Sequence, residues 1–369
     1  MKFETKPRRE FRKVIIIAIS WTLLTLFSFI SQYFFIYDLI ELNKLSGTYE
    51  FWPDFTGILI LGLFGGFVGG YLLVFKMGTR YRQKSFTFGI LHSGFLFIVT
   101  YLFLAVVGLF IMDLIYFVLQ MSFSSAVTKS IDNVLFNMKS PTFFITMCVW
   151  AFLISGTQFI LQVNDKFGPG VLWKFITGRY YHPREEDKIF MFLDLKSSTP
   201  IAEKMGSKKY FELLKDIYRD ITEPIINSLG DIYQYVGDEV VVSWSVENGL
   251  AKNNCLLCYF RIEQVLEKRK EIYLNKYGIH PSFKAGIHLG EVTVGEIGVI
   301  KKDIVFSGDV LNTTSRIQNE CNNQKVKILI SSQLLQRLQL NGEYEKVPLG
   351  EIQLKGKQEK VAINTVRRI

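Results

Sequence analysis

Apolar residues dominate the first half of the chain, whereas helical and strand-like patterns alternate in the second half. Four stretches of the first half contain no Asp, Glu, Lys or Arg and are long enough to cross a bilayer, which takes about 20 residues in a helix. Backbone groups inside lipid must be satisfied internally, so we expect each stretch to be helical. The four expected spans are Val14–Tyr37, Phe55–Phe75, Ser85–Met112 and Ser140–Val163.

Charged residues between these stretches predict how the chain is oriented. Basic residues are concentrated in residues 6–13 and 76–84, whereas residues 38–54 carry four acids and one lysine. Because basic loops stay on the cytoplasmic side, we expect a cytoplasmic N-terminus. Four spans then return the rest of the chain to the cytoplasm. The expected location is the cell membrane, multi-pass, with membrane lipid as one partner.

One ionisable residue, His92, lies inside the third expected span. Such residues are candidates for function, but we favour a neutral histidine hydrogen-bonded to a neighbouring helix. After the fourth span, Phe167-Gly168-Pro169-Gly170 is expected to end the helix. Residues 171–180 that follow are either a short interfacial helix or plain linker.

The second half has the pattern of a globular α+β domain. Short apolar runs indicate strands, and apolar residues at helical spacing indicate helices. Their order predicts a ferredoxin-like (βαββαβ) palm. The expected elements are a strand over Lys188–Leu195, a helix over Ser207–Leu229, a hairpin within Asp231–Trp244, a helix over Gly249–Lys276, a hairpin of Ser282–Leu289 and Glu291–Gly295 around Gly290, a helix over Asp309–Cys321, a strand over Lys325–Ile330, a short helix from Ser332 and paired strands within Tyr344–Val366.

These patterns divide the chain into three parts. We expect a four-helix transmembrane domain at 1–163, a linker at 164–186 and a catalytic domain at 187–369. The net charge is +9, but the basic residues are dispersed or flank apolar segments, so we expect no nucleic-acid partner. Four cysteines are too few for a disulfide framework, and the Cys255/Cys258 pair fits a buried helix face better than a zinc or redox site.

Two aspartates are the strongest candidates for chemistry. Asp194 ends the first predicted strand, and Asp238 lies at the tip of the adjacent predicted hairpin. Neighbouring strands bring the two carboxylates together, where they can bind hard cations such as Mg²⁺ or Mn²⁺ with substrate phosphates. Two ions in one site can activate a hydroxyl and hold a triphosphate. The turn after Asp194, through Ser197, Ser198 and Thr199, offers backbone N–H groups to phosphate.

Five segments in this half resemble the ordered motifs of the class III adenylate and guanylate cyclase catalytic domain. They are FLDLKSST, YQYVGDE, GIHLGEVTVGEIG, SGDVLNTTSR and LKGK. The resemblance covers residues 187–369. It implies a homodimer with two equivalent sites, each shared across a head-to-tail interface. It also implies that Asp194 and Asp238, with the Leu195 carbonyl nearby, hold two ions per site.

The resemblance assigns further roles to residues near the end of the chain. Asn312 and Arg316 are similar to the family's transition-state pair, and their i, i+4 spacing places them on one helix face. Arg316 would brace charge developing on the transferred phosphoryl group. Lys355 is similar to the family's triphosphate-binding lysine, with Lys357 as a less favoured substitute.

The chain departs from the family where the base is read. The two reader positions hold Gln234, which can both donate and accept hydrogen bonds, and Val305, which can do neither. Asp303 or Ser307 is a substitute for Val305 after a small register change. The family's Gly-Phe after the first metal aspartate is replaced by Ser197-Ser198. These residues do not choose between the two bases, and ATP is favoured over GTP only because the chain looks like a bacterial cyclase.

We thus expect a membrane-anchored cyclase that converts ATP, or alternatively GTP, to a 3′,5′-cyclic nucleotide and pyrophosphate for intracellular signalling. The enzyme class is adenylate cyclase, a phosphorus–oxygen lyase, with guanylate cyclase second. A non-catalytic membrane receptor with a degenerate cyclase domain is a rival interpretation. Such a receptor would be expected to have lost a metal-binding aspartate, the asparagine or the arginine, and this chain keeps all four: Asp194, Asp238, Asn312 and Arg316. A diguanylate cyclase and a polymerase palm fit the motifs less well.

Overall fold

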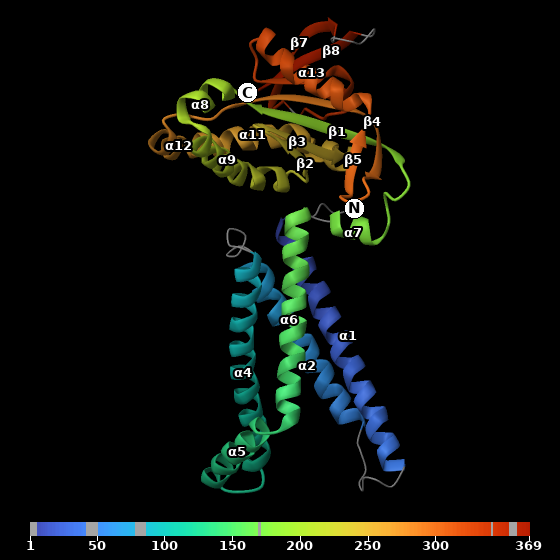
Figure 1. The fold of residues 1–369 in the computed structure, drawn as a ribbon, viewed down its shortest axis with the longest axis vertical. Helices are drawn as coiled ribbons and strands as arrows, with labels where there is room; N and C mark the ends of the chain where they lie inside the picture. Colours follow the sequence, from blue (N-terminus) through green and yellow to red (C-terminus); the bar gives the residue numbers. More distant parts are fainter. Residues whose placement is uncertain (1–5, 42–50, 78–85, 169–170, 341, 354–359) are drawn as a thin grey trace. The chain divides into compact units, whose positions relative to one another are not determined.

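The computed structural model describes residues 6–41, 51–77, 86–168, 171–340, 342–353 and 360–369 (Figure 1). The chain divides into two compact units, Met1–Phe167 and Gly168–Ile369. We call them the N-terminal and C-terminal units and describe each by itself. The described part of the N-terminal unit is helical, whereas the C-terminal unit is built on one sheet.

Long apolar helices form the N-terminal unit. Close packing of the first two depends on Gly66, where a side-chain carbon would lie 2.8 Å from the Ala18 Cα atom. The Trp21 indole donates to the Thr157 hydroxyl at 2.9 Å and joins the first helix to the last. The elements are α1 (Lys6–Glu41), α2 (Phe51–Tyr71), a π-helical turn (Leu72–Met77), α4 (Phe86–Val118), α5 (Phe123–Met138) and α6 (Pro141–Phe167).

Three helical segments among the described residues are long and apolar enough to cross a membrane. They are Glu10–Asp38, Ile58–Lys76 and Phe143–Asn164. The third expected span falls on α4 from Phe86 onwards, where the described residues contain the shorter apolar segments Thr87–Thr100 and Val106–Val118. All four stretches are helical in their described part, while a fourth membrane crossing stays a prediction. Helix α5 was not expected from the sequence.

The ring of His92 stacks on that of Phe88, one helical turn earlier in α4, with 5.2 Å between the ring centroids. This contact lies within one helix. A hydrogen bond from His92 to a neighbouring helix therefore remains a prediction.

A mixed sheet organises the C-terminal unit, in the strand order β2-β3-β1-β4-β6-β8-β7, with β5 paired to β4. The part β2-β3-β1-β4 is antiparallel throughout, as the predicted βαββαβ order requires, and β6 then adds parallel to β4. The strands are β1 (Arg184–Leu195), β2 (Asp231–Val236), β3 (Glu239–Ser245), β4 (Phe283–Ile297), β5 (Asp303–Ser307), β6 (Ile328–Ser331), β7 (Tyr344–Gln353) and β8 (Lys360–Arg368).

Helices cover both faces of this sheet, so β1 is apolar on both sides. Ile189 and Met191 enter the main core with α9 and α11, whereas Phe190 and Phe192 face the other way and share a cluster with Val310 of α13. The helices are α7 (Val171–Ile176), α8 (Ser198–Met205), α9 (Ser207–Asn227), α10 (Val246–Leu250), a 3₁₀ turn (Ala251–Asn253), α11 (Asn254–Lys268), α12 (Lys270–Tyr277), α13 (Asp309–Asn323) and α14 (Ser332–Leu335).

The hairpin expected around Gly290 is wrong, because β4 runs without a break through this residue. Gly290 pairs with Lys188 of β1. A side-chain carbon at Gly290 would lie 3.1 Å from the Val310 side chain, so this glycine lets α13 pack on the sheet. The hairpin forms later, between β4 and β5.

The single helix expected over Gly249–Lys276 is also wrong. Lys252 and Asn253 adopt positive φ angles and separate α10 from α11, and α12 follows after Arg269. The Asn253 amide donates to the Gln339 carbonyl at 2.6 Å, and its oxygen accepts from the Gln339 N–H at 3.0 Å, which holds the break in place. Cys255 and Cys258 lie fully buried on α11, which confirms the buried helix face.

The C-terminal unit begins structurally before the predicted boundary at 187. Strand β1 starts at Arg184, and the side chain of Tyr180 is only 2% exposed within the cluster that contains Phe190. The Tyr180 carbonyl also accepts the backbone N–H of Glu296 at 2.9 Å. Residues just before β1 are therefore part of the folded unit.

Candidate active site

Two antiparallel strands bring the carboxylates of Asp194 and Asp238 together. Asp194 lies at the end of β1 and pairs in register with Glu239, the first residue of β3. Asp238 precedes Glu239 in the turn between β2 and β3, after Gly237 at φ 62°. Burial, opposed by Lys284 and reinforced by the negative charge of Asp238, raises the pKa of Asp194. The predicted convergence is therefore realised within one chain.

One oxygen of Asp194 is held by two side chains from different elements. The Lys284 ammonium of β4 lies 3.0 Å from Oδ2, and the Gln318 amide of α13 donates to the same oxygen at 3.2 Å. Asp194 and Lys284 are direct partners in the β1–β4 register. Both contacts go to Oδ2, and the same carboxyl also interacts with that of Asp238.

Asp238 presents an unsatisfied acceptor. Its Oδ2 atom is buried and has no hydrogen-bond partner, an arrangement that a bound cation would relieve. The Leu195 side chain is hydrocarbon and is buried in the core, so this residue can offer a cation only its backbone carbonyl. Among the described residues, no group of three or more His, Cys, Asp or Glu could hold a metal. The donor set fits hard cations that complete their coordination with substrate phosphates.

A third carboxylate, Glu239, predicts a pH effect on stability. Burial, followed by the charges of Asp194 and Asp238, raises the pKa of Glu239 to about 7. The folded state therefore binds this proton more tightly than the unfolded state. Its contribution to stability is complete below the ordinary pKa of about 4.3 and is lost as pH rises through about 7.

For a fragment that starts at residue 168, without divalent cations, we expect the melting temperature to decrease as pH is raised from about 5 to about 8. The Glu239→Gln variant should show a flatter profile, because glutamine does not titrate. Circular dichroism melts at several pH values test this. Identical profiles for the two proteins would contradict it.

The phosphate-binding turn predicted after Asp194 leads into α8, which begins at Ser198. Ser197 has a left-handed backbone with φ 59°, a conformation that glycine adopts at less cost. This is the position where the chain lacks the glycine expected from the motif. Thr199 lies in the first turn of α8, so the predicted N–H groups of this turn are grouped at one helix start.

The two candidate base readers lie on strands that tertiary contacts bring close together. The Tyr233 hydroxyl accepts the backbone N–H of Phe306 at 3.2 Å, and the two ring centroids are 4.5 Å apart. Gln234 and Val305 are the chain neighbours of this pair. Gln234 is exposed on β2, and Val305 is half-buried on β5.

The substitutes considered for Val305 lie at the two ends of β5. Asp303 begins the strand, is exposed, and forms an ion pair with Lys301 at 2.9 Å. Ser307 ends the strand, is exposed, and pairs in register with Thr293. Neither residue occupies the register position of Val305, which lies opposite Gly295.

Helix α13 carries different candidate residues on different sides. Gln318 is buried and contacts Asp194, whereas Asn312 is exposed and Arg316 is partly exposed. At about 100° per residue, Asn312 and Arg316 lie about 120° and 160° around the helix from Gln318. The structure therefore does not bring the Asn312/Arg316 pair to the carboxylates of its own chain. Lys355, the predicted triphosphate ligand, lies outside the described residues.

Sequence reasoning missed four residues around the carboxylates: Lys284, Gln318, Glu239 and Tyr218. Glu239 alone had a signal, since it follows Asp238 in the hairpin motif. Tyr218 of α9 donates to the Gly237 carbonyl at 2.6 Å. Burial and then the charge of Asp238 raise the pKa of Tyr218, so its hydroxyl stays protonated and donates.

Comparison with known proteins gives one family. Residues 180–365 match the adenylate and guanylate cyclase catalytic domain. The chain is 34% identical over 220 residues to "Adenylate cyclase 2" of Rhizobium meliloti (strain 1021), a match that covers 59% of this chain and 61% of the relative. It is 25% identical over 173 residues to "Adenylate cyclase 1" of the same organism, a match that covers 45% of this chain and 25% of that relative. The chain thus spans less than two thirds of the length of either relative.

Two solved structures of a bacterial light-regulated adenylyl cyclase share the fold at 18% identity. Their TM-scores are 0.51 and 0.52; the first match covers 63% of this chain and 66% of the other, and the second covers 62% and 67%. At this identity the likeness concerns the fold alone.

Proposed function

Because the chain belongs to the adenylate and guanylate cyclase catalytic domain family, we propose that it converts a purine nucleoside triphosphate to its 3′,5′-cyclic monophosphate and pyrophosphate. The observation that carries this proposal is the convergence of Asp194 and Asp238 at one end of the β1–β3 pair. The reaction is an in-line attack of the ribose 3′-oxygen on the α-phosphorus. The 3′-hydroxyl gives up its proton to solvent, and the new P–O bond forms as the bond to the pyrophosphate oxygen breaks.

Asp194, Asp238 and the Leu195 carbonyl would hold the cations, two per site, as Mg²⁺ or Mn²⁺. The unpartnered Oδ2 of Asp238 and the closeness of the two carboxyl groups support this assignment. A bound divalent ion neutralises phosphate charge and lowers the pKa of the attacking hydroxyl. Lys284 and Gln318 orient Asp194 through its Oδ2 atom.

The remaining residues bind and brace the substrate. Backbone N–H groups at Ser197, Ser198 and Thr199 face phosphate oxygens, as helix starts commonly do. Arg316 stabilises the charge that develops on the transferred phosphoryl group, with Asn312 beside it on the same helix face. Lys355 holds the triphosphate.

We propose that each site is shared between two copies of this chain in a head-to-tail homodimer. Asn312 and Arg316 lie on a different side of α13 from Gln318, which contacts the chain's own Asp194. A second copy that offers its Asn312 and Arg316 would complete the site. The same operation places this chain's pair in the partner's site, which gives two equivalent sites.

ATP is the proposed substrate, because the relatives at 34% and 25% identity are named adenylate cyclases. With Mn²⁺ present, we expect the full chain to form cyclic AMP from ATP at least about tenfold faster than cyclic GMP from GTP, a ratio that a few base contacts can supply. Chromatography of the products measures both rates. Faster turnover of GTP would reverse the base assignment, and no product from either nucleotide would contradict the cyclase proposal.

A shorter protein for the same assay should begin at residue 168. Tyr180 is buried against β1, and its carbonyl is bonded to Glu296. A fragment that starts at residue 181 would remove this packing, so loss of activity in it would carry no information about catalysis.

The proposed location is the cell membrane, with a cytoplasmic N-terminus and catalytic domain. Three candidate spans and the apolar helix α4 support a four-span anchor. The basic residues of 6–13 and 76–84 support this orientation. In the cytoplasm the catalytic domain has access to nucleoside triphosphates.

A further inference from the structure

One tyrosine outside the cyclase motifs holds the backbone that carries Asp238. The Tyr218 hydroxyl of α9 donates to the Gly237 carbonyl at 2.6 Å. Its ring also packs on Tyr235 of β2, with 4.6 Å between the centroids. Tyr218 therefore contacts the hairpin at two residues, Tyr235 and Gly237, which precede Asp238.

The turn itself is short, because Gly237 and Asp238 lie between Val236 and Glu239, which pair across β2 and β3. Gly237 has φ 62°, and a side-chain carbon there would meet no atom within 4 Å, so the turn is not packed from that side. The buried Oδ2 of Asp238 has no hydrogen-bond partner of its own. The ladder fixes the base of the turn, and the Tyr218 hydroxyl adds a side-chain contact to the carbonyl at its tip.

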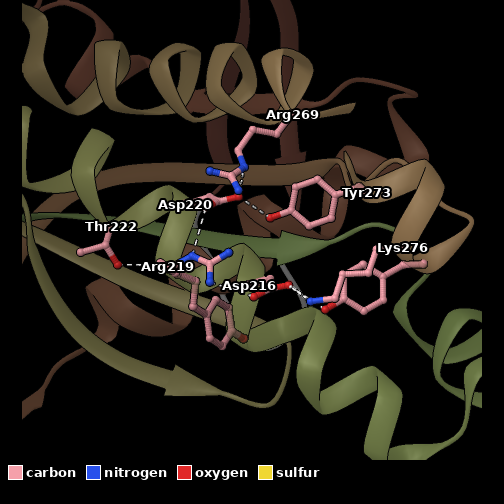
Figure 2. Close-up of polar contacts among 9 residues, drawn as sticks. Asp216, Arg219, Asp220, Thr222, Arg269, Tyr273 and Lys276 are labelled. Carbon is pink, nitrogen blue, oxygen red and sulfur yellow. Dashed lines mark hydrogen bonds and ion pairs between the residues drawn. The ribbon is translucent and has the colours of Figure 1, made fainter. Parts of the chain in front are cut away.

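Helix α9 is a rigid support for this contact, because its opposite side is tied to α12 (Figure 2). Asp220 is buried and accepts from the Tyr273 hydroxyl at 2.6 Å, with Arg269 at 2.8 Å. One turn earlier, Asp216 accepts from Lys276 at 2.7 Å. Tyr218 lies between the two aspartates in the sequence, so its position is set by the same helix.

We propose that Tyr218 is a positioning residue, which holds the Gly237 carbonyl so that the Asp238 carboxylate is preorganised to bind the divalent cation. The proposal rests on the proposed function, since it takes Asp238 as a cation ligand. Tyr218 acts through the hairpin backbone, by its contacts with Gly237 and Tyr235.

The test is Tyr218→Phe, which removes only the hydroxyl. Binding of Mn²⁺ to the full chain in detergent is followed by the loss of the free-ion electron paramagnetic resonance signal. We expect the Mn²⁺ concentration for half-occupancy to rise about threefold to tenfold, the value of one hydrogen bond. The Mn²⁺ concentration for half-maximal cyclase activity should rise by the same factor, while the rate at saturating Mn²⁺ changes little.

The matched control is Tyr277→Phe. Its hydroxyl donates to Asp216 of α9 at 2.7 Å, so the variant also loses one hydrogen bond to α9, but on the side away from the hairpin. We expect it to lower thermal stability about as much as Tyr218→Phe, with Mn²⁺ binding unchanged. An equal loss of Mn²⁺ affinity in both variants would overturn the proposal, because α9 would then act only as general support.

A second variant, Gly237→Ala, disturbs the same contact by changing the residue whose carbonyl accepts the hydrogen bond from Tyr218. Alanine has room there but resists the left-handed backbone, so Mn²⁺ binding should weaken as in Tyr218→Phe. This variant decides the question if Tyr218→Phe does not fold. Unchanged Mn²⁺ affinity in Tyr218→Phe and Gly237→Ala, with normal binding by the wild type, overturns this inference alone. A wild-type chain that neither binds Mn²⁺ nor forms cyclic nucleotide overturns the proposed function as well.

Discussion

Replacing Asp194 with asparagine is expected to lower cyclic nucleotide formation by at least about a thousandfold, because a lost metal ligand removes several kcal/mol of transition-state stabilisation. Asparagine keeps the volume of the side chain and an oxygen that Lys284 and Gln318 can still bind. The fold should therefore survive. Product formation with saturating ATP and Mn²⁺ measures the effect, and a thermal melt checks that the variant is folded.

The matched control for this variant is Glu345→Gln. It neutralises an exposed carboxylate on β7, which lies at the edge of the sheet beside β8. We expect wild-type activity from it. If Asp194→Asn retained more than about a tenth of wild-type activity, a loss of less than about 1.4 kcal/mol, the assignment of Asp194 as a cation ligand would be wrong.

The second large effect is expected for Arg316→Ala, with a loss of about 100- to 1000-fold in turnover, as for other groups that stabilise a charged transition state. Arg316 is partly exposed on α13, away from the side that contacts Asp194. Mn²⁺ binding should therefore stay at the wild-type value. A parallel loss of Mn²⁺ binding would place Arg316 in the chain's own cation site and contradict the assignment.

Mixing the two inactive variants tests whether the site is shared between chains. A heterodimer of Asp194→Asn and Arg316→Ala contains one site with both defects and one intact site. Random pairing should restore about a quarter of wild-type activity, because half of the dimers are mixed and each has one working site. Activity that stays at the sum of the separate variants would mean that each site uses residues of one chain only.

Much of the sheet could be predicted, because its patterns are local. Strand β1, the hairpin around Gly237-Asp238 and helix α9 follow from apolar periodicity and turn residues alone. The same reasoning failed at Gly290, where a glycine that serves packing against Val310 was interpreted as a turn. Glycine marks both situations in a sequence, and only the neighbouring helix distinguishes them.

The candidate site divides in a similar way. Asp194, Asp238, Asn312 and Arg316 could be predicted as candidates because they belong to short motifs with fixed spacing. Tyr218, Lys284 and Gln318 have no motif, since their roles depend on contacts with residues far along the chain: 19 positions separate Tyr218 from Gly237, and 124 separate Gln318 from Asp194. Nothing in the sequence around these three residues distinguishes them from other tyrosines, lysines and glutamines; only the fold places them near the two carboxylates.

By itself, the sequence determined the apolar helical half, the βαββαβ core and the convergence of Asp194 and Asp238, which we propose to bind cations. These features depend on composition and on spacings of a few residues, so they can be predicted without knowing which distant residues are in contact. Tertiary structure decided that Lys284 and Gln318 both contact Oδ2 of Asp194, that Asp238 has an unpartnered oxygen, and that α13 directs Arg316 away from its own chain's carboxylates. These outcomes depend on the direction of side chains on packed elements, which spacing along the chain does not encode.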